Sequence, residues 1–211
     1  NTDTYSEYSS RSGFYRINYN FRDKYLLETN GRYDGSSKFP KDSRFGFFPS
    51  VSVGWQLGRE NFMSFAKNYL NELKLRASYG SIGNQEISPY QYSPDMSIGK
   101  SNVWASGNKL VTAIGVPSLV SRDFTWETVT TLDFGADFAL FKSRLQGTFD
   151  WYQRDTKNML TAGVVQLPAT VGAPAPTQNT ASMRTNGWEL TIRWADKIGK
   201  VGYRAGLNLY D

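Results

Sequence analysis

The sequence contains no cysteine and no histidine among its 211 residues. Their absence excludes thiol nucleophiles, disulfide bonds, the usual zinc ligands and acid–base catalysis by imidazole. No run of about 18 apolar residues is present either, which excludes a transmembrane helix. We therefore expect no metal site and no bound cofactor.

The sequence also lacks a cluster of basic residues and a recognisable signal peptide. The 24 Lys and Arg residues exceed the 19 Asp and Glu residues by only five, and they are scattered along the chain. The sequence therefore contains no basic cluster of the kind that follows a phosphate backbone, and nucleic-acid binding is not expected. The first ten residues, NTDTYSEYSS, lack the basic, apolar and small-residue order of a signal peptide. We expect either that a leader was removed or that the chain is an internal piece.

Aromatic residues are abundant instead. Thirteen Phe, thirteen Tyr and six Trp make up 15% of the chain, yet the mean hydropathy is −0.50, as in a soluble protein. Outer-membrane β-barrels combine these two properties. Only every second residue of their strands faces lipid, so the average hides the apolar face.

The alternating stretches are long. GRYDGSSKFPKDSRFGFFPSVSVGWQL, residues 31–57, alternates aromatic with small or polar side chains. A strand rises about 3.3 Å per residue, and soluble strands usually have about 5 or 6 residues, whereas a tilted membrane-spanning strand needs about 9 to 11. Phe48 interrupts the alternation and Pro49 lacks a ladder donor, so we expect a bulge there.

Period-2 alternation predicts eight antiparallel strands. They lie within residues 12–35, 44–56, 73–80, 126–156 and 187–210. The expected connections are compact at 22–24, 141–143 and 196–200, and long at 35–43, 83–122 and 157–184. Short turns at one end and long loops at the other are typical of an outer-membrane barrel.

The connection at residues 58–71 differs from the other short ones. Phe62, Phe65, Ala66 and Tyr69 recur at helical spacing. This spacing predicts a short amphipathic helix.

Alternation alone leaves other all-β architectures open. A soluble β-sandwich binding domain shows the same period, and eight is a permitted number of strands for a small closed outer-membrane barrel. Strand length and the asymmetry of the connections favour a membrane barrel.

Several linked motifs carry a family resemblance. They are DKYLLETNGRYDGSSKF, FFPSVSVGWQL, ENFM, LNELKLRASYGSIGNQ, WETVTTLDFGADFALFKSRLQGTFDWYQRDTKNML and TNGWELTIRW. In this order and spacing they closely resemble the barrel of the SusC/RagA family of TonB-dependent outer-membrane transporters. The resemblance covers nearly the whole chain and is weakest in the two longest loops.

The resemblance implies active import of large nutrients, typically glycans or peptides, across the outer membrane of a Gram-negative bacterium. It also implies an N-terminal plug domain, energy supplied through the TonB complex and a SusD-like surface lipoprotein that caps the barrel. Residues 1–211 contain neither the plug nor a TonB-contacting segment. Since a plugged barrel has about 22 strands, the expected fold is an all-β antiparallel transmembrane β-barrel segment, with about eight strands of that larger barrel.

The carboxylates allow two interpretations. Asp133 with Asp137, or Asp150 with Asp155, could form a glycosidase pair. On alternating strands, however, these side chains face a polar lumen beside Arg144, Arg154 and Arg193, where cross-strand charge pairs are expected. No motif supplies a nucleophile, so we expect no enzyme activity.

The aromatic residues also allow two interpretations. Trp55, Trp126 and Trp194 lie near predicted strand ends and suit an interfacial belt in contact with outer-membrane lipid, although a sandwich core would use them equally. In the loop at 83–122, Tyr90, Tyr92 and Trp104 are candidates for stacking on a ligand or anchoring a capping partner. Such aromatics also pack the interior of a long loop.

Overall fold

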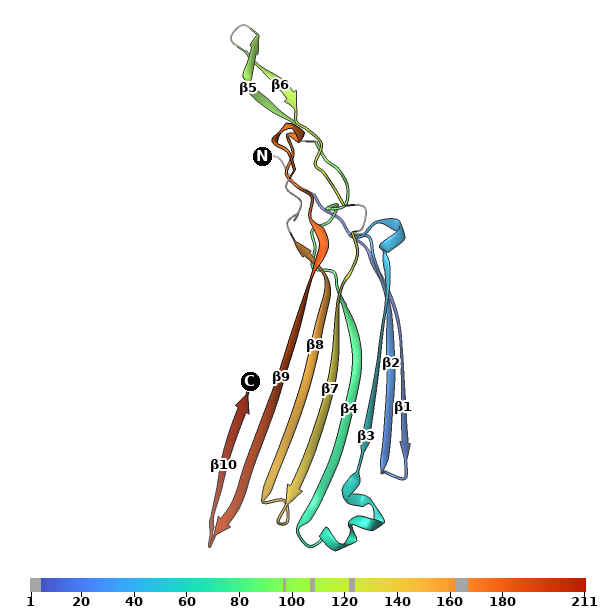
Figure 1. Cartoon of the computed structure of the whole chain (residues 1–211), viewed down its shortest axis with the longest axis vertical. Helices are drawn as coiled ribbons and strands as arrows, with labels where there is room; N and C mark the ends of the chain where they lie inside the picture. Colours follow the sequence, from blue (N-terminus) through green and yellow to red (C-terminus); the bar gives the residue numbers. More distant parts are fainter. Residues whose placement is uncertain (1–4, 97, 107–108, 122–123, 162–166) are drawn as a thin grey trace.

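The computed structural model describes residues 5–96, 98–106, 109–121, 124–161 and 167–211. Its main element is one antiparallel sheet in the order β1-β2-β3-β4-β7-β8-β9-β10, drawn as a curved wall in Figure 1. The strands of this sheet are β1 (Ser10–Phe21), β2 (Tyr25–Ser36), β3 (Phe45–Trp55), β4 (Leu70–Asn84), β7 (Glu127–Leu140), β8 (Leu145–Thr161), β9 (Gln178–Ile198) and β10 (Val201–Tyr210). The eight predicted strands are confirmed.

The two outermost strands, β1 and β10, lie at opposite edges of the sheet. Within the described residues they do not pair with each other, so these strands do not form a small closed barrel. They also do not divide into two packed sheets. Both architectures that alternation left open are therefore disfavoured.

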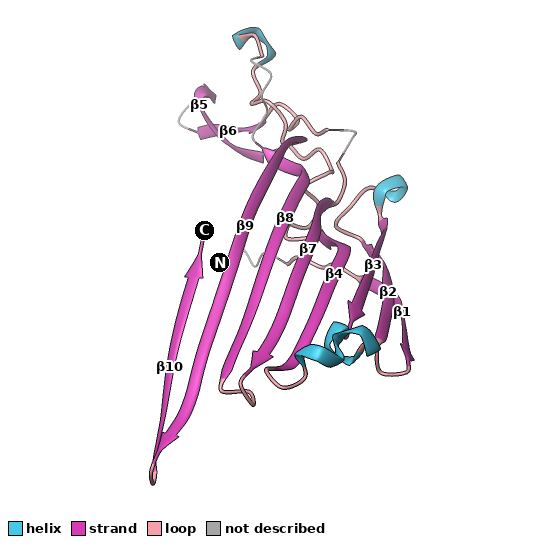
Figure 2. Cartoon of the chain, turned by 60° about the horizontal axis from the view of Figure 1, so that its bottom comes forward, coloured by secondary structure: helices cyan, strands magenta, loops and turns pink. Residues whose placement is uncertain are grey.

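The connections differ in length between the two ends of the sheet. Three residues join β1 to β2, four join β7 to β8, and two join β9 to β10. Gly199, with φ of +59°, provides the left-handed conformation in the last of these turns. Figure 2 shows the tight turns and one helical connection at one end, opposite the long loops. We call these the short-turn end and the long-loop end.

The long loops contain structure that alternation did not predict. Within the expected loop 83–122, β5 (Ile98–Ser106) pairs with β6 (Lys109–Ile114) as a separate hairpin, which projects beyond the sheet in Figure 1. β8 and β9 also extend to Thr161 and from Gln178, further than their alternating faces indicated. With 17 and 21 residues, both exceed the length that a membrane crossing needs.

The helical connection between β3 and β4 forms, but as 3-10 helix rather than α-helix. It contains η2 (Leu57–Arg59) and η3 (Asn61–Ala66), while η1 (Lys41–Ser43) and η4 (Ala169–Val171) lie in the long loops. No helix among the described residues has the length and apolar character needed to cross a membrane.

The prediction of a bulge at Phe48 and Pro49 is wrong. The register between β2 and β3 is continuous, with Arg32 opposite Phe48 and Gly31 opposite Pro49. The pairing of β3 with β4 instead ends at Ser50 and Gly80. Pro49 therefore lies just beyond the ladder to β4, where its missing N–H leaves no gap.

Period-2 alternation gives the sheet two chemically different faces, because successive side chains point to opposite sides. Cross-strand partners stay on the same face along the ladders, apart from register shifts at Leu70/Glu72 of β4 and between Thr156 and Leu160 of β8. The polar face includes Glu28, Asn30, Ser50, Ser52, Arg76, Ser78, Asp133, Asp137, Thr148, Asp150, Glu189 and Thr191. The apolar face includes Tyr19, Phe21, Tyr25, Leu27, Val51, Val53, Trp55, Leu75, Tyr79, Phe134, Phe149, Trp151, Leu190 and Ile192.

Candidate ligand-facing and lipid-facing surfaces

An ion-pair network occupies the middle of the polar face. Arg76 of β4 donates from Nε and Nη2 to both carboxylate oxygens of Asp137 on β7, at 2.9 and 3.2 Å. Its Nη2 also donates to Asp150 of β8 at 2.8 Å. Gly135 lies between them, and a Cβ there would collide with both Arg76 and Asp150. The network ties three strands together through one guanidinium group.

Cross-strand charge pairs are thus present, but most of the predicted partners were wrong. Asp137 and Asp150 pair with Arg76, and Asp155 pairs with Arg184. Of the three arginines named from the sequence, Arg144 pairs with Asp196, while Arg154 and Arg193 form no ion pair within the described residues. Alternation identifies the face of a charge, but the ladder register determines which cation lies opposite.

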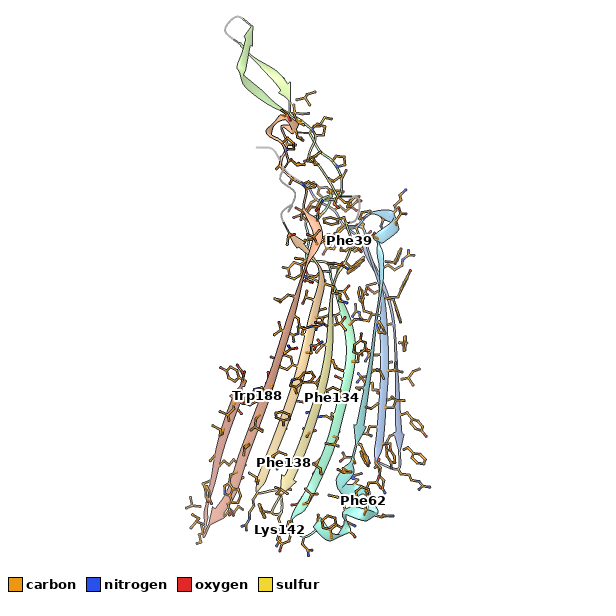
Figure 3. All side chains as sticks on the ribbon, viewed as in Figure 1. Phe39, Phe62, Phe134, Phe138, Lys142 and Trp188 are labelled. Carbon is orange, nitrogen blue, oxygen red and sulfur yellow. The ribbon has the colours of Figure 1, made fainter. Side chains whose placement is uncertain are left out.

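A small aromatic core lies at the long-loop end of the sheet. Phe39, Phe48, Phe124 and Trp126 are all buried and pack together, and Figure 3 places Phe39 at the base of the loops. The Phe39 and Trp126 rings lie 4.6 Å apart. The indole N–H of Trp126 donates to the backbone carbonyl of Arg44 at 3.2 Å. The expectation that Trp126 belongs to a lipid-facing belt is therefore wrong.

A groove of about 700 Å³ lies beside this core. Its lining combines polar-face residues with the two core aromatics Phe48 and Trp126. The polar lining residues include Glu28, Asn30, Arg32, Asp34, Ser50, Ser78 and Gln85. The groove therefore offers carboxylate, amide, hydroxyl and guanidinium groups next to aromatic rings, a combination suited to polar organic ligands.

The three loop aromatics named from the sequence do not form one cluster. Tyr90 is 55% exposed and lines a cleft of about 630 Å³ together with Ser88, Asp95 and Ser118. The Ser118 hydroxyl donates to Asp95 at 2.9 Å, which fastens the two sides of this loop. Tyr92 instead packs against the aromatic core.

Trp104 lies in β5, and its side chain is outside the described residues. The structure therefore places Tyr90 at an accessible cleft and Tyr92 in a packing role.

Aromatic rings line the apolar face at the short-turn end. Phe21, Tyr25 and Trp55 follow one another across three strands, with centroids 6.4 Å apart at each step. A second pair, Tyr33 with Phe45, lies further along the same strands at 5.3 Å. From Tyr25 to Tyr33 is eight residues of β2, or about 27 Å of strand. With a tilt near 40° this spans about 21 Å along the barrel axis, comparable to the roughly 25 Å apolar band of an outer-membrane barrel.

One polar face, one apolar face with two aromatic rows and asymmetric connections constitute the geometry of a barrel wall. A family model described as "TonB dependent receptor-like, beta-barrel" matches residues 1–211. The chain belongs to this family. The resemblance predicted from the sequence motifs and the transmembrane barrel fold are thereby confirmed.

Named relatives of this TonB-dependent receptor barrel include SusC and RagA. TonB-dependent receptor P26 of Formosa agariphila is 35% identical over 192 residues, covering 90% of this chain and 19% of that receptor. TonB-dependent receptor SusC of Bacteroides thetaiotaomicron is 34% identical over 183 residues, covering 86% of this chain and 18% of that receptor. The RagAB peptide transporter superposes with a TM-score of 0.80 and 27% identity, covering 96% of this chain and 22% of that one.

The chain thus spans about a fifth of the length of the relatives that it matches. The eight strands are a segment of a TonB-dependent receptor barrel. Among the described residues of this segment, no group of three His, Cys, Asp or Glu side chains is placed to hold a metal ion.

One polar cluster of the receptor barrel escaped the sequence analysis. Glu60, in the connection after β3, accepts hydrogen bonds from Lys24 Nζ at 2.9 Å, the Tyr25 hydroxyl at 2.8 Å and the Trp55 indole N–H at 3.1 Å. We call these four residues the Glu60 clamp. The Lys24 hydrogen bond, followed by those from Tyr25 and Trp55, lowers the pKa of Glu60 from its ordinary 4.5 to about 2.

The Glu60 clamp joins the helical connection to the β1–β2 turn. Its partners lie up to 36 positions apart in the sequence, so no local pattern marks it. The only feature of the sequence that pointed to the clamp was the presence of one basic and one acidic residue, Lys24 and Glu60, at a short-turn end rich in aromatic residues.

Proposed function

We propose that residues 1–211 form part of the wall and extracellular loops of a TonB-dependent outer-membrane importer of glycans or other large nutrients such as peptides. The plug domain and the remaining strands belong to parts of the protein outside this segment. The observation that carries the proposal is the pair of opposite faces on one eight-stranded sheet of this family. The apolar face contacts lipid, and the polar face lines the lumen.

Orientation follows from the connections. In outer-membrane barrels the short turns face the periplasm and the long loops face outward. The tight turns after β1, β7 and β9 therefore face the periplasm, and the loops around Tyr90 face the cell exterior. This orientation supports a location in the cell outer membrane of a Gram-negative bacterium.

The partners follow from the same arrangement. A SusD-like surface lipoprotein would cap the long-loop end, and the TonB complex would act through parts of the protein outside residues 1–211. Tyr90 is accessible at the extracellular cleft and is the strongest of the three loop aromatics for contacting a glycan or peptide. Tyr92 would support the loop from below, and Trp104 extends the same loop.

The role proposed for the segment is not enzymatic. The candidate glycosidase pairs were Asp133 with Asp137 and Asp150 with Asp155. Asp137 and Asp150 both bind Arg76, and Asp155 binds Arg184. Glycoside hydrolysis needs two carboxyl groups that are free to act on the scissile bond, and here arginine side chains occupy these three carboxylates. These side chains hold the wall together.

The proposal is tested on the full-length receptor in its own bacterium. Deletion of the gene should abolish growth on one class of glycan or peptide while leaving growth on free monosaccharides and amino acids intact. The full-length receptor should fractionate with the outer membrane. Recovery of the protein from the soluble periplasm without detergent, or unchanged growth of the deletion strain on every polymer tested, would contradict the proposal.

The loop contribution is tested with Tyr90→Ala, which should weaken ligand capture. Tyr19→Ala is the matched control because Tyr19 is also exposed but lies on the apolar face of β1, far from the long loops. If both variants bind ligand as the wild type does, Tyr90 makes no ligand contact.

A further inference from the structure

The short-turn end carries a group of exposed aromatic side chains. Phe62, Phe65 and Tyr69, in the connection between β3 and β4, are 60%, 79% and 65% exposed. Phe141, in the β7–β8 turn, contacts Tyr69 edge-on with ring centroids 6.5 Å apart. Exposed apolar groups gathered in one place mark an interaction surface rather than ordinary solvent-facing residues.

Basic residues accompany these rings. Lys67 lies between Phe65 and Tyr69, and Lys142 directly follows Phe141. Both lysines are exposed, and neither forms an ion pair within the part of the chain that the structure describes. Figure 3 shows Phe62 and Lys142 at the same end of the sheet. Aromatic rings beside unpaired basic groups are typical of segments that lie in a membrane interface.

The Glu60 clamp fixes where this segment begins. Tyr25 and Trp55 belong to the apolar face, and both hydrogen-bond Glu60, the residue immediately before η3. The clamp therefore ties the start of η3 to the lipid-facing aromatic row. A 3-10 helix has three residues per turn, so Phe62 and Phe65 lie on one side of η3 and Ser64 lies on another.

We propose that residues 61–69, together with Phe141 and Lys142, form an interfacial anchor that binds anionic phospholipid in the periplasmic leaflet of the outer membrane. Phe62 and Phe65 enter the boundary between headgroups and acyl chains, while Lys67 and Lys142 contact the lipid phosphates. The inference rests on the proposed function, because it requires the short-turn end to face the periplasm.

Membrane depth is measured by spin labelling of the full-length receptor in vesicles of phosphatidylethanolamine and phosphatidylglycerol. Single cysteines replace Phe65 or Ser64, in a receptor with no other cysteine; residues 1–211 contribute none. The label at 65 should be more accessible to oxygen than to a water-soluble nickel chelate, and the label at 64 should show the reverse. Equal aqueous exposure at both positions overturns the anchor. A label at 65 that is shielded from both reagents also overturns it, because another protein segment then covers the surface.

Lipid selectivity is measured by native mass spectrometry of the full-length receptor released from the same lipid mixture. Each of Lys67→Gln and Lys142→Gln should lower the retention of phosphatidylglycerol relative to phosphatidylethanolamine roughly fivefold, the effect of one basic residue near an anionic surface. Lys41→Gln, an exposed lysine at the long-loop end, is the control and should leave the ratio unchanged. An unchanged ratio in the Lys67 and Lys142 variants contradicts phospholipid binding by these lysines.

These outcomes are separable from the proposed function. If the receptor fractionates with the outer membrane and imports its ligand while the label at 65 is aqueous, only the anchor is wrong. If the receptor is absent from the outer membrane, the proposed function fails first.

Discussion

Two neighbouring phenylalanines of β3 illustrate how single residues divide between the two faces. Phe48 is 7% exposed and packs in the aromatic core, whereas Phe47 is 54% exposed on the apolar face. A Cβ added at Gly46 or Gly83 would collide with the Phe48 ring. These two glycines leave room for the Phe48 ring. The ring fills the region where β3 and β4 no longer pair.

We expect Phe48→Ala to destabilise the full-length receptor by about 3 to 5 kcal/mol, because it removes a buried ring and leaves a cavity. Phe47→Ala is the matched control and should have a smaller effect, since lipid fills the space of the missing ring. For both variants, the free energy of unfolding is measured in guanidinium or urea, with the gel mobility of the folded barrel as the readout. A larger effect at position 47 would show that the assignment of the two faces is reversed.

A second prediction concerns Ile192 and Thr191, adjacent on β9. Ile192→Arg would put a charge on the apolar face and should destabilise the receptor by about 2 to 4 kcal/mol if it lies near the bilayer midplane. Thr191→Arg would add the same charge to the polar face and should be mild. Equal effects, or the reverse order, measured by unfolding of the reconstituted receptor, would contradict the lipid-facing assignment of β9.

At the scale of elements, the helical connection depends on the Glu60 clamp. The pKa of Glu60 is about 2, below its ordinary 4.5, so the charged carboxylate stabilises the folded state. For a lowered pKa this contribution is fully present above about pH 4.5 and disappears as the pH falls towards 2.

Glu60→Gln should therefore lower stability at pH 7, and the gap from the wild type should narrow between pH 4.5 and 2. Glu72→Gln is the control, since Glu72 forms no ion pair within the described chain. Thermal unfolding of the receptor in detergent across this pH range gives the comparison. A gap that is independent of pH would mean that the Glu60 charge does not stabilise the connection.

Some elements were predictable from the sequence and others were not, for physical reasons. Alternation with period 2 predicted the strands and their faces because each side chain's direction depends only on its own strand. It failed for Trp126, whose burial depends on Phe39 and Phe48 from distant segments. It also failed for the ion pairs, since the choice of Arg76 over Arg154 depends on the register across three strands.

Phe48 shows a subtler limit. Because Phe48 is a large aromatic residue on the polar face, it resembled a break in the alternation of β3. It points to the face that its position in β3 requires, and its ring fills the space beside Gly46 and Gly83. The β5–β6 hairpin and the extensions of β8 and β9 lie at the long-loop end. If this end projects from the membrane as proposed, lipid does not impose the alternation of apolar and polar residues there.

For the whole molecule, the open edges of the sheet have a direct consequence. Each edge strand presents unpaired N–H and C=O groups, and in lipid each such group costs several kcal/mol. Residues 1–211 expressed alone should therefore aggregate in detergent. Reversible refolding of this segment into a monomer whose gel mobility changes on heating would contradict that expectation.

The central claim is that these strands are one segment of the wall of a larger barrel. A structure of the full-length receptor in detergent or lipid tests it most directly. We predict backbone hydrogen bonds from β1, near Phe14–Phe21, and from β10, near Tyr203–Tyr210, to strands outside residues 1–211. Hydrogen bonds that join β1 to β10 would contradict the claim and would show a closed eight-stranded barrel instead.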